Sequence, residues 1–172
     1  MNSNRQLQGR QSRALGESFE QWIEASLNYY EWQKIACISK TPEPVKILSK
    51  VDHFGRFQAC FVKKAQPDFK GTLCDGTCII FEAKHTEKDR ILQSAVTDEQ
   101  AEIFDKYQLM GAKCFVMVSL GLQSFYRIPW AVWSDMKQIT GHKYMNADDL
   151  AAYRLKSDGM IIKLLDGIEL RD

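Results

Sequence analysis

Two short stretches decide the fold of this chain: Gln66-Pro67-Asp68-Phe69-Lys70-Gly71 and Ile79-Ile80-Phe81-Glu82-Ala83-Lys84. The segment between them contains aspartate and glycine, which are typical of turns. We therefore expect a hairpin, with Asp68 on or near the first strand and Glu82 on the second. Because side chains alternate along a strand, Glu82 and Lys84 share one face. This spacing predicts that two carboxylates and an ammonium group converge on one spot.

Such a group of side chains suits phosphodiester hydrolysis. Asp68 and Glu82 are candidate ligands for Mg²⁺, a hard ion that keeps several waters and accepts phosphate oxygens. The ion would lower the pKa of a bound water and neutralise charge that develops on the phosphate. Lys84 would orient the attacking water, or deprotonate it if burial lowers the lysine pKa. The alternative is an exposed strand with an ordinary Glu-Lys pair, but the preceding Pro67-Asp68 favours a site.

Composition indicates one ordinary globular domain. The chain has 172 residues, of which 45% are hydrophobic and 26% charged, enough for a single core. It contains no apolar run long enough for a membrane span and no secretory signal, and five scattered cysteines indicate reduced thiols in a cytoplasmic protein. Cys74 and Cys78 lack the second pair that structural zinc needs. No glycine-rich phosphate loop is present, so we expect no nucleotide cofactor.

Charge is distributed unevenly along the chain. The net charge of +1 divides into +4 over residues 1–64 (ten Lys/Arg against six Asp/Glu) and −3 over residues 65–172 (thirteen against sixteen). Basic and aromatic residues alternate between 46 and 64, a composition that suits DNA binding through stacking and phosphate contacts. The alternative for the arginine-rich residues 1–13 is a solvated tail without a DNA contact. The alternative for the basic and aromatic segment is an ordinary surface hairpin. The candidate DNA-binding residues are Arg10, Arg13, Lys50, Arg56, Lys63 and Lys64.

Residues 1–13 are polar and arginine-rich, and we expect a flexible basic arm there. Apolar residues recur at helical spacing from Gly16 to about Gln33, with Ser12 as a plausible cap. Glu20 on this helix is either a third carboxylate of the site or a solvated side chain. The remaining expectations are a strand at 58–65, a charged loop and apolar turn at 85–96, a helix at 97–110, strands at 114–120 and 125–130, helices at 130–139 and 147–155, and a last strand at 160–165.

A capping box, Thr97-Asp98-Glu99-Gln100, marks the start of the second long helix. Gln100 is either a supporting residue that enters the active site or part of the cap. Gly111 is expected to end this helix.

The signature Pro67-Asp68 with Glu82-Ala83-Lys84 resembles that of the PD-(D/E)XK nuclease superfamily. The surrounding order is similar to the RecU family of Holliday junction resolvases over roughly residues 13–130. The quoted matches are Gly16-Glu17-Ser18-Phe19-Glu20, Thr41-Pro42-Glu43-Pro44, Asp68-Phe69-x-Gly71, Phe81-Glu82-Ala83-Lys84-x-Thr86 and Tyr126-Arg127-Ile128-Pro129.

The resemblance implies an α/β fold with a restriction-endonuclease-like core: a mixed central β-sheet flanked by helices, with a stalk at about 51–64 that projects into the junction. It implies one nuclease domain over 14–172, acting as a homodimer that makes paired nicks in four-way DNA junctions with Mg²⁺ or Mn²⁺. Asp68 and Glu82 would be metal ligands, Lys84 the water-orienting lysine and Glu20 a further catalytic acid.

One departure from the family is visible, because Pro67 stands where a hydroxyl residue often precedes the first aspartate. The short stalk and compact chain would suit a phage or prophage version. Two other functions fit the same residues: a sequence-specific restriction-type endonuclease, and an inactive DNA-binding or architectural protein.

Overall fold

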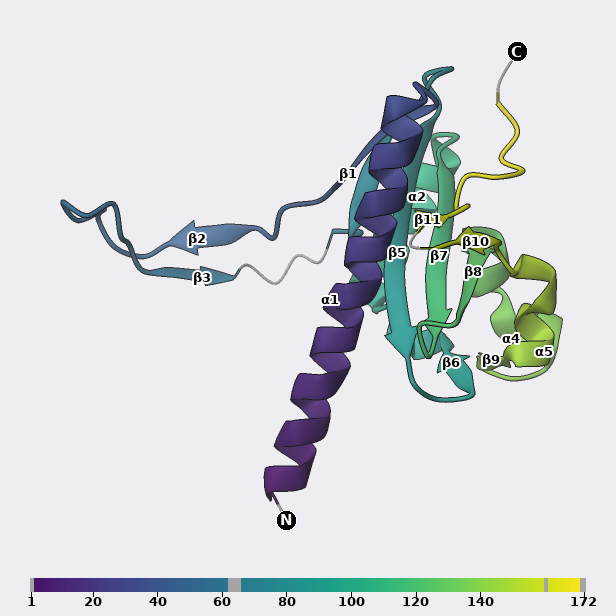
Figure 1. Ribbon diagram of the computed structural model, residues 1–172, viewed down its shortest axis with the longest axis horizontal. Helices are drawn as coiled ribbons and strands as arrows, with labels where there is room; N and C mark the ends of the chain where they lie inside the picture. Colours follow the sequence, from purple (N-terminus) through teal and green to yellow (C-terminus); the bar gives the residue numbers. More distant parts are fainter. Residues whose placement is uncertain (1, 62–65, 160, 171–172) are drawn as a thin grey trace.

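A five-stranded mixed sheet forms the centre of the computed structural model, which describes residues 2–61, 66–159 and 161–170. Its strand order is β1-β4-β5-β7-β8, and only β5 and β7 pair in parallel. The expected mixed sheet flanked by helices is confirmed (Figure 1). The strands are β1 (Ala36–Lys40), β4 (Phe69–Leu73), β5 (Cys78–Thr86), β7 (Lys113–Leu120) and β8 (Ser124–Pro129).

Helices cover both faces of this sheet and make three layers. The long helix α1 (Asn2–Trp32) crosses one face together with the C-terminal segment that contains β11 (Ile161–Ile162) (Figure 1). The other face is covered by α2 (Asp98–Leu109), α3 (Trp130–Ser134), α4 (Met136–Thr140) and α5 (Ala147–Leu150). Because β5 and β7 are covered on both faces, their buried parts, Ile79–Phe81 and Cys114–Val118, are apolar runs rather than alternating patterns.

Three stacked phenylalanines fix the register of the central strands. Phe69 pairs with Phe81 and Phe81 with Phe115, and their ring centroids lie 4.9 and 4.7 Å apart. All three rings face α1. Because a slip of one residue would turn them to the opposite face, this row also determines that Asp68 and Glu82, the next residues along each strand, face α2.

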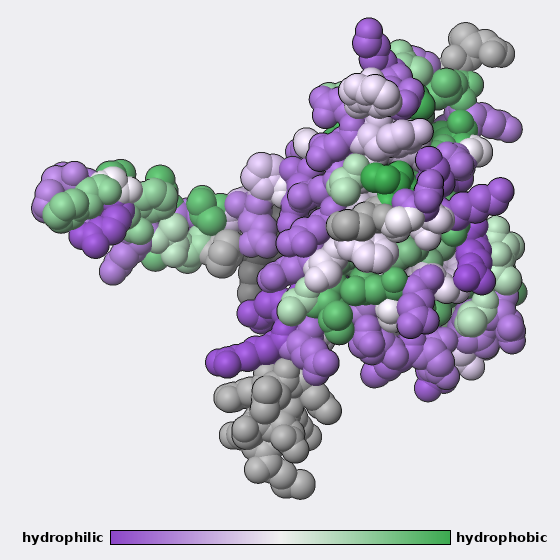
Figure 2. Space-filling view, viewed as in Figure 1, coloured by the Kyte–Doolittle hydropathy of each residue, from purple (hydrophilic) through white to green (hydrophobic). Residues whose placement is uncertain are grey.

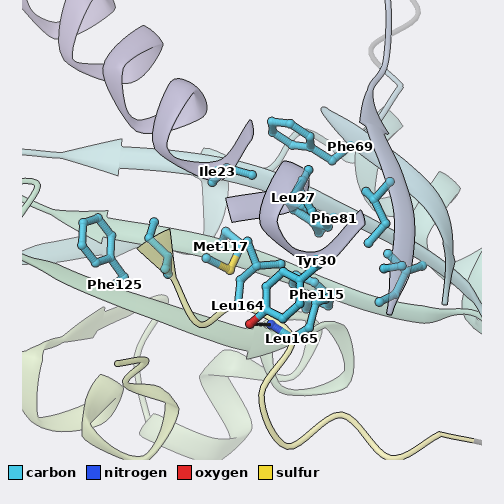
Figure 3. Packing of buried hydrophobic residues seen from close by; sticks show 14 of the residues in the cluster. Ile23, Leu27, Tyr30, Phe69, Phe81, Phe115, Met117, Phe125, Leu164 and Leu165 are labelled. Atoms are coloured by element: carbon cyan, nitrogen blue, oxygen red, sulfur yellow. Dashed lines mark hydrogen bonds between the residues drawn. The ribbon is translucent and has the colours of Figure 1, made fainter. Parts of the chain in front are cut away.

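The α1 face of the core closes through the end of the chain. Ile23, Leu27 and Tyr30 point from α1 into the same cluster as Phe81 and Phe115 (Figure 3). Two α1 hydroxyls accept hydrogen bonds from the C-terminal backbone: Ser26 Oγ from Ile162 N at 2.7 Å, and Tyr30 OH from Leu165 N at 3.3 Å. The C-terminal segment is therefore part of the core.

A two-stranded hairpin projects away from the sheet as the expected stalk (Figure 1). It consists of β2 (Val45–Ile47) and β3 (Ala59–Phe61), with Asp52 organising the tip by accepting from the amides of Phe54 and Arg56. The predicted start at residue 51 is wrong, because β2 supplies the outgoing strand. Hydrophobic side chains lie along the hairpin surface (Figure 2), and the exposed ones are Val45, Ile47, Leu48, Val51, Phe54 and Phe57.

Several predicted boundaries are also wrong. Helix α1 begins at Asn2, so Ser12 lies inside the helix and residues 2–13 continue it rather than form a separate irregular arm. The segment at 130–139 divides into α3 and α4, and the helix at 147–155 ends as α5 followed by the 3₁₀ helix η2 (Ala151–Tyr153). The predicted last strand shortens to β11, which pairs with β10 (Ser157–Asp158).

The segment at 85–96 also differs from its prediction, because one part of it pairs with a distant strand. Residues 85–96, expected as a loop, include the end of β5, the strand β6 (Arg90–Leu92) and the 3₁₀ helix η1 (Gln93–Ala95). β6 forms because it pairs with β9 (Tyr144–Asn146), more than fifty residues later. Across the described residues, no helix is long and apolar enough to cross a membrane.

Candidate active site

Asp68 and Glu82 are held opposite each other where the β4–β5 ladder ends. The last backbone pair is Phe69 with Phe81. Beyond it, the amide of Asp68 donates to Glu82 Oε2 at 3.1 Å, and the amide of Ala83 donates to Asp68 Oδ2 at 2.9 Å. Each carboxylate thus takes up a backbone donor of the other strand, which fixes both acids without using all of their oxygen lone pairs.

Glu82 is the most enclosed member of the site, and its whole residue is 1% exposed. Its Oε1 accepts from Lys84 Nζ and from Gln100 Nε2, both at 2.6 Å. The Lys84 side chain keeps 24% of its surface exposed, so its ammonium group borders solvent while its charge compensates the buried carboxylate.

Gln100 makes both of the contacts that its position suggested. Its backbone and side chain complete the capping box with Thr97, in which Thr97 N donates to Gln100 Oε1 at 3.1 Å. The amide nitrogen of the same side chain donates to Glu82. Helix α2 therefore begins at the site and orients Glu82 through a side chain that is itself 5% exposed and fixed by the cap.

The Glu82 carboxylate is close enough to disturb the ionisation of Asp68. Burial and the negative charge of Glu82 raise the pKa of Asp68 to about 7, although the Ala83 amide and the Lys84 charge act in the opposite direction. Near neutral pH the carboxyl group of Asp68 is therefore poised between its protonated and ionised forms. A cation bound between the two carboxylates would replace that proton.

Lys40 is a site residue that sequence reasoning missed. Its Nζ lies 2.5 Å from Glu20 Oε2, and this hydrogen bond is the main reason that the lysine pKa is raised. Lys40 lies opposite Phe69 in the β1–β4 ladder, and the charge of Asp68 also reaches it. Glu20 is thus engaged by Lys40 at the α1 edge of the site instead of joining Asp68 and Glu82 as a third carboxylate.

Hard oxygen donors of this kind fit a divalent cation. Asp68 and Glu82 are buried or half-buried carboxylates that repel each other, which is the donor set that Mg²⁺ prefers. Within the described ranges, no group of three or more His, Cys, Asp or Glu side chains gathers as a ready metal cage. The two carboxylates would leave most coordination positions to water and substrate. Among the described residues, Cys74 and Cys78 belong to no such group, and all five cysteines are free thiols.

The candidate DNA-binding residues lie on different parts of the molecule. Arg10 and Arg13 are exposed on α1, and Lys50 is exposed on the stalk. Arg56, at the stalk tip, has Nε 3.2 Å from Asp52 Oδ2 and its guanidinium over the Phe54 ring at 4.8 Å. Lys63 and Lys64 lie outside the described residues.

The geometry defines a class first: a mixed α/β domain with a carboxylate pair and a lysine at the end of a central hairpin, and a projecting arm. The model of the family named Recombination protein U, RecU, matches residues 14–170. The chain belongs to the RecU family, which confirms the resemblance seen in the sequence.

Similar proteins carry the same name. The Holliday junction resolvase RecU of Streptococcus mutans is 34% identical over 121 residues, covering 66% of this chain and 60% of that protein. The one from Streptococcus equi subsp. zooepidemicus is 31% identical over 157 residues, covering 87% of this chain and 74% of the relative. Matches to Streptococcus pneumoniae relatives cover 57% of their length. Hjc, a Holliday junction resolvase from Archaeoglobus fulgidus, aligns with a TM-score of 0.48 and 12% identity over 80% of this chain and 88% of that one.

Proposed function

We propose that this protein is a structure-selective, metal-dependent DNA endonuclease that resolves four-way junctions by paired symmetric nicks. The observation that carries the proposal is the Asp68–Glu82 pair with Lys84 2.6 Å from the Glu82 carboxylate, in a member of the RecU family. The names of its relatives support the choice of substrate. Residues 14–172 would form one nuclease domain.

Asp68 and Glu82 would hold Mg²⁺ or Mn²⁺. When bound, the ion supplies positive charge to the scissile phosphate and acidifies water. Ala83 N and Gln100 keep the two carboxylates oriented, because both donate hydrogen bonds to them. Lys84 Nζ would orient the attacking water, and Lys40 with Glu20 would balance charge at the opposite edge of the site.

Symmetric nicks need two sites related by a two-fold axis, so we infer a homodimer. The stalk would enter the junction, and the arginines of α1 would contact DNA backbones. An enzyme with free thiols acting on DNA would work in the cytoplasm.

The direct test uses a fluorescently labelled four-way junction and a linear duplex of the same sequence, each with Mg²⁺ and with EDTA. We expect paired nicks in the junction only, and only with the metal. Cleavage of the duplex at one sequence with the junction untouched would identify a restriction-type enzyme. Binding of the junction without cleavage under Mg²⁺ and Mn²⁺ would identify an architectural protein instead.

A further inference from the structure

A basic pocket lies at the β8 edge of the sheet, where η2 and the C-terminal segment meet. It has a volume of about 400 Å³. Among the described residues that line it, four are cationic and one is acidic, a local balance of +3 in a chain with a net charge of +1. The cations are Arg127, Arg154, Lys156 and Lys163, and the acid is Asp166.

The protein itself leaves this charge largely uncompensated. Among the described residues, none of the four cations forms an ion pair within 4.0 Å, and Asp166 Oδ1 accepts a hydrogen bond from Tyr30 OH at 3.1 Å. Arg127 is the most enclosed cation, and burial lowers its pKa, which reflects the cost of keeping a charge there. A site built at such a cost suits an anionic ligand.

The cations are anchored in different ways around the pocket. Arg127 Nη1 donates to the carbonyl of Leu164 at 2.8 Å, and Lys163 Nζ lies 4.5 Å above the Tyr29 ring. Arg154 Nη2 is 3.4 Å from Ser124 Oγ, and Lys156 is exposed. Guanidinium and ammonium groups on several sides of one pocket match a tetrahedral oxyanion, since each phosphate oxygen can accept a charge-assisted hydrogen bond.

The pocket lies at the β8 edge on the α1 side of the sheet, so DNA held by the carboxylates on the α2 side would reach it around that edge. Across the sheet, Lys84 pairs with Val118, Val118 with Tyr126, and Tyr126 bridges to Arg154. Three strand spacings separate the backbones of Lys84 and Arg154 by about 14 Å. That distance corresponds to about four base-pair steps of duplex.

We propose that this pocket binds a phosphate group. The identification of that group as a backbone phosphate of the DNA substrate rests on the proposed function, whereas a free phosphate or pyrophosphate would use the same contacts. A bound backbone phosphate would position a DNA arm at the edge of the sheet opposite β1, from whose side the stalk projects (Figure 1).

Lysine acetylation of the intact protein tests the pocket directly. The protein would be treated with an acetylating reagent in EDTA, alone or with a four-way junction, a linear duplex or inorganic pyrophosphate, and modified lysines quantified by mass spectrometry. We expect DNA to slow acetylation of Lys156 and Lys163 several-fold, while the exposed Lys106 and Lys137 react as before.

Each arm of this experiment has a distinct meaning. Protection by DNA identifies a backbone phosphate, and protection by pyrophosphate alone identifies a free phosphate ligand; no protection by either overturns the proposal. Because EDTA removes the metal, the readout does not depend on cleavage. A protein that is protected but never cleaves would contradict the proposed function alone, and one that cleaves without protection would contradict the pocket alone.

A pair of charge-matched variants provides the second test. Arg154→Gln/Lys156→Gln should weaken junction binding in EDTA by about 3- to 10-fold and reduce the salt dependence by about one to two charges. Lys106→Gln/Lys137→Gln removes the same charge elsewhere and should bind like the wild type. An equal loss of junction affinity in both double variants would show that the pocket is not a specific phosphate site and would overturn the proposal.

Arg127 is kept in both variants, since its guanidinium holds the C-terminal segment through Leu164. Thermal melts establish that the variants fold. If the first double variant melts early, Lys156→Gln alone should still weaken binding, and unchanged binding by that single variant would also overturn the proposal.

Discussion

The hairpin formed by β4 and β5 and the hairpin formed by β2 and β3 are both antiparallel, but they bury very different amounts of surface. Phe69 and Phe81 of the first are 0% exposed, whereas Phe54 at the tip of the second is 68% exposed. The first hairpin lies between two layers of helices. The second stands on two strands alone, an arrangement that is marginally stable in water. Under the proposed function, the rigid hairpin would hold the catalytic geometry, and the more flexible one would recognise the junction.

The largest expected effect separates chemistry from binding. Asp68→Asn or Glu82→Gln should lower junction cleavage by about 10³-fold or more, because each would remove a proposed charged metal ligand. Junction affinity in EDTA should stay within about threefold, since the stalk and basic surfaces are intact. Gel-based cleavage and fluorescence anisotropy measure the two quantities. Glu102→Gln, an exposed change on α2, is the matched control, and turnover retained by both site variants would refute the assignment.

A second comparison uses one glycine from each hairpin. In Gly71→Ala the new Cβ would meet the Cys37 carbonyl oxygen at a distance far below van der Waals contact, so β1 and β4 could not keep their spacing. We expect a loss of about 3 kcal/mol in the free energy of unfolding, measured by urea denaturation.

Gly55→Ala in the stalk tip is the counterpart of that change. Gly55 has a positive φ of +77° but open space around its Cβ position, so the strain of about 1 kcal/mol stays local. The urea midpoint of the domain should not move. An equal shift in both variants would mean that the stalk unfolds together with the sheet.

Gln100 tests how much the rigid hairpin depends on its support. Gln100→Ala removes both the capping contact and the hydrogen bond to Glu82, and we expect cleavage to fall by about 10- to 100-fold. Thr97→Ala removes the cap but leaves the Glu82 contact, and should cost about 1 kcal/mol of stability with little change in cleavage. Equal cleavage rates in the two variants would assign Gln100 to the cap alone.

The ionisation of Asp68 gives a pH dependence of the metal-free protein. Its pKa of about 7 in the folded state exceeds the ordinary value of 3.8, so the folded state holds the proton more tightly than the unfolded chain. Stability from this group is fully present below about pH 4 and is lost as pH rises through 7. Relative to Asp68→Asn, the wild type should lose about 4 kcal/mol across this window in EDTA. If the free energy of unfolding varied with pH in the same way in both proteins, the raised pKa of Asp68 would be contradicted.

The smallest effect is expected at the stalk. Lys50→Gln and Arg56→Gln should leave the free energy of unfolding within about 0.5 kcal/mol, because both side chains are exposed. Each should weaken junction binding about two- to fivefold and lower its salt dependence. Titrations at two salt concentrations measure this, and unchanged binding would reduce the stalk to a surface hairpin.

Local sequence signals predicted the parts of the site that depend on near neighbours. Asp68 and Glu82 were assigned to one hairpin, and Thr97 with Gln100 to a capping box, because turn residues and helix caps act within a few positions. The structure confirms both elements. The Gln100 side chain connects them, because it belongs to the capping box and donates a hydrogen bond to Glu82. The dual contact of Gln100 could be named in advance only as two alternatives.

Contacts between distant segments escaped prediction. Lys40 meets Glu20 only because α1 packs across β1, and no residue near either one signals that encounter. The start of α1 was misplaced because its first turns carry few apolar residues and so lack helical periodicity. The predicted start of the stalk lies too far along the sequence, because Val45 and Ile47 form a strand only by pairing with residues beyond the tip.

The hydrogen bonds from Ser26 and Tyr30 to the C-terminal backbone also set an order of events during synthesis. Helix α1 is synthesised before the strands of the sheet, yet its buried hydroxyls meet Ile162 and Leu165 some 136 and 135 positions later. Until those residues emerge, the apolar face of α1 and the phenylalanine row beneath it cannot be fully enclosed. The nascent chain would therefore complete its core only after Leu165 has emerged, a long-range closure typical of slow-folding topologies.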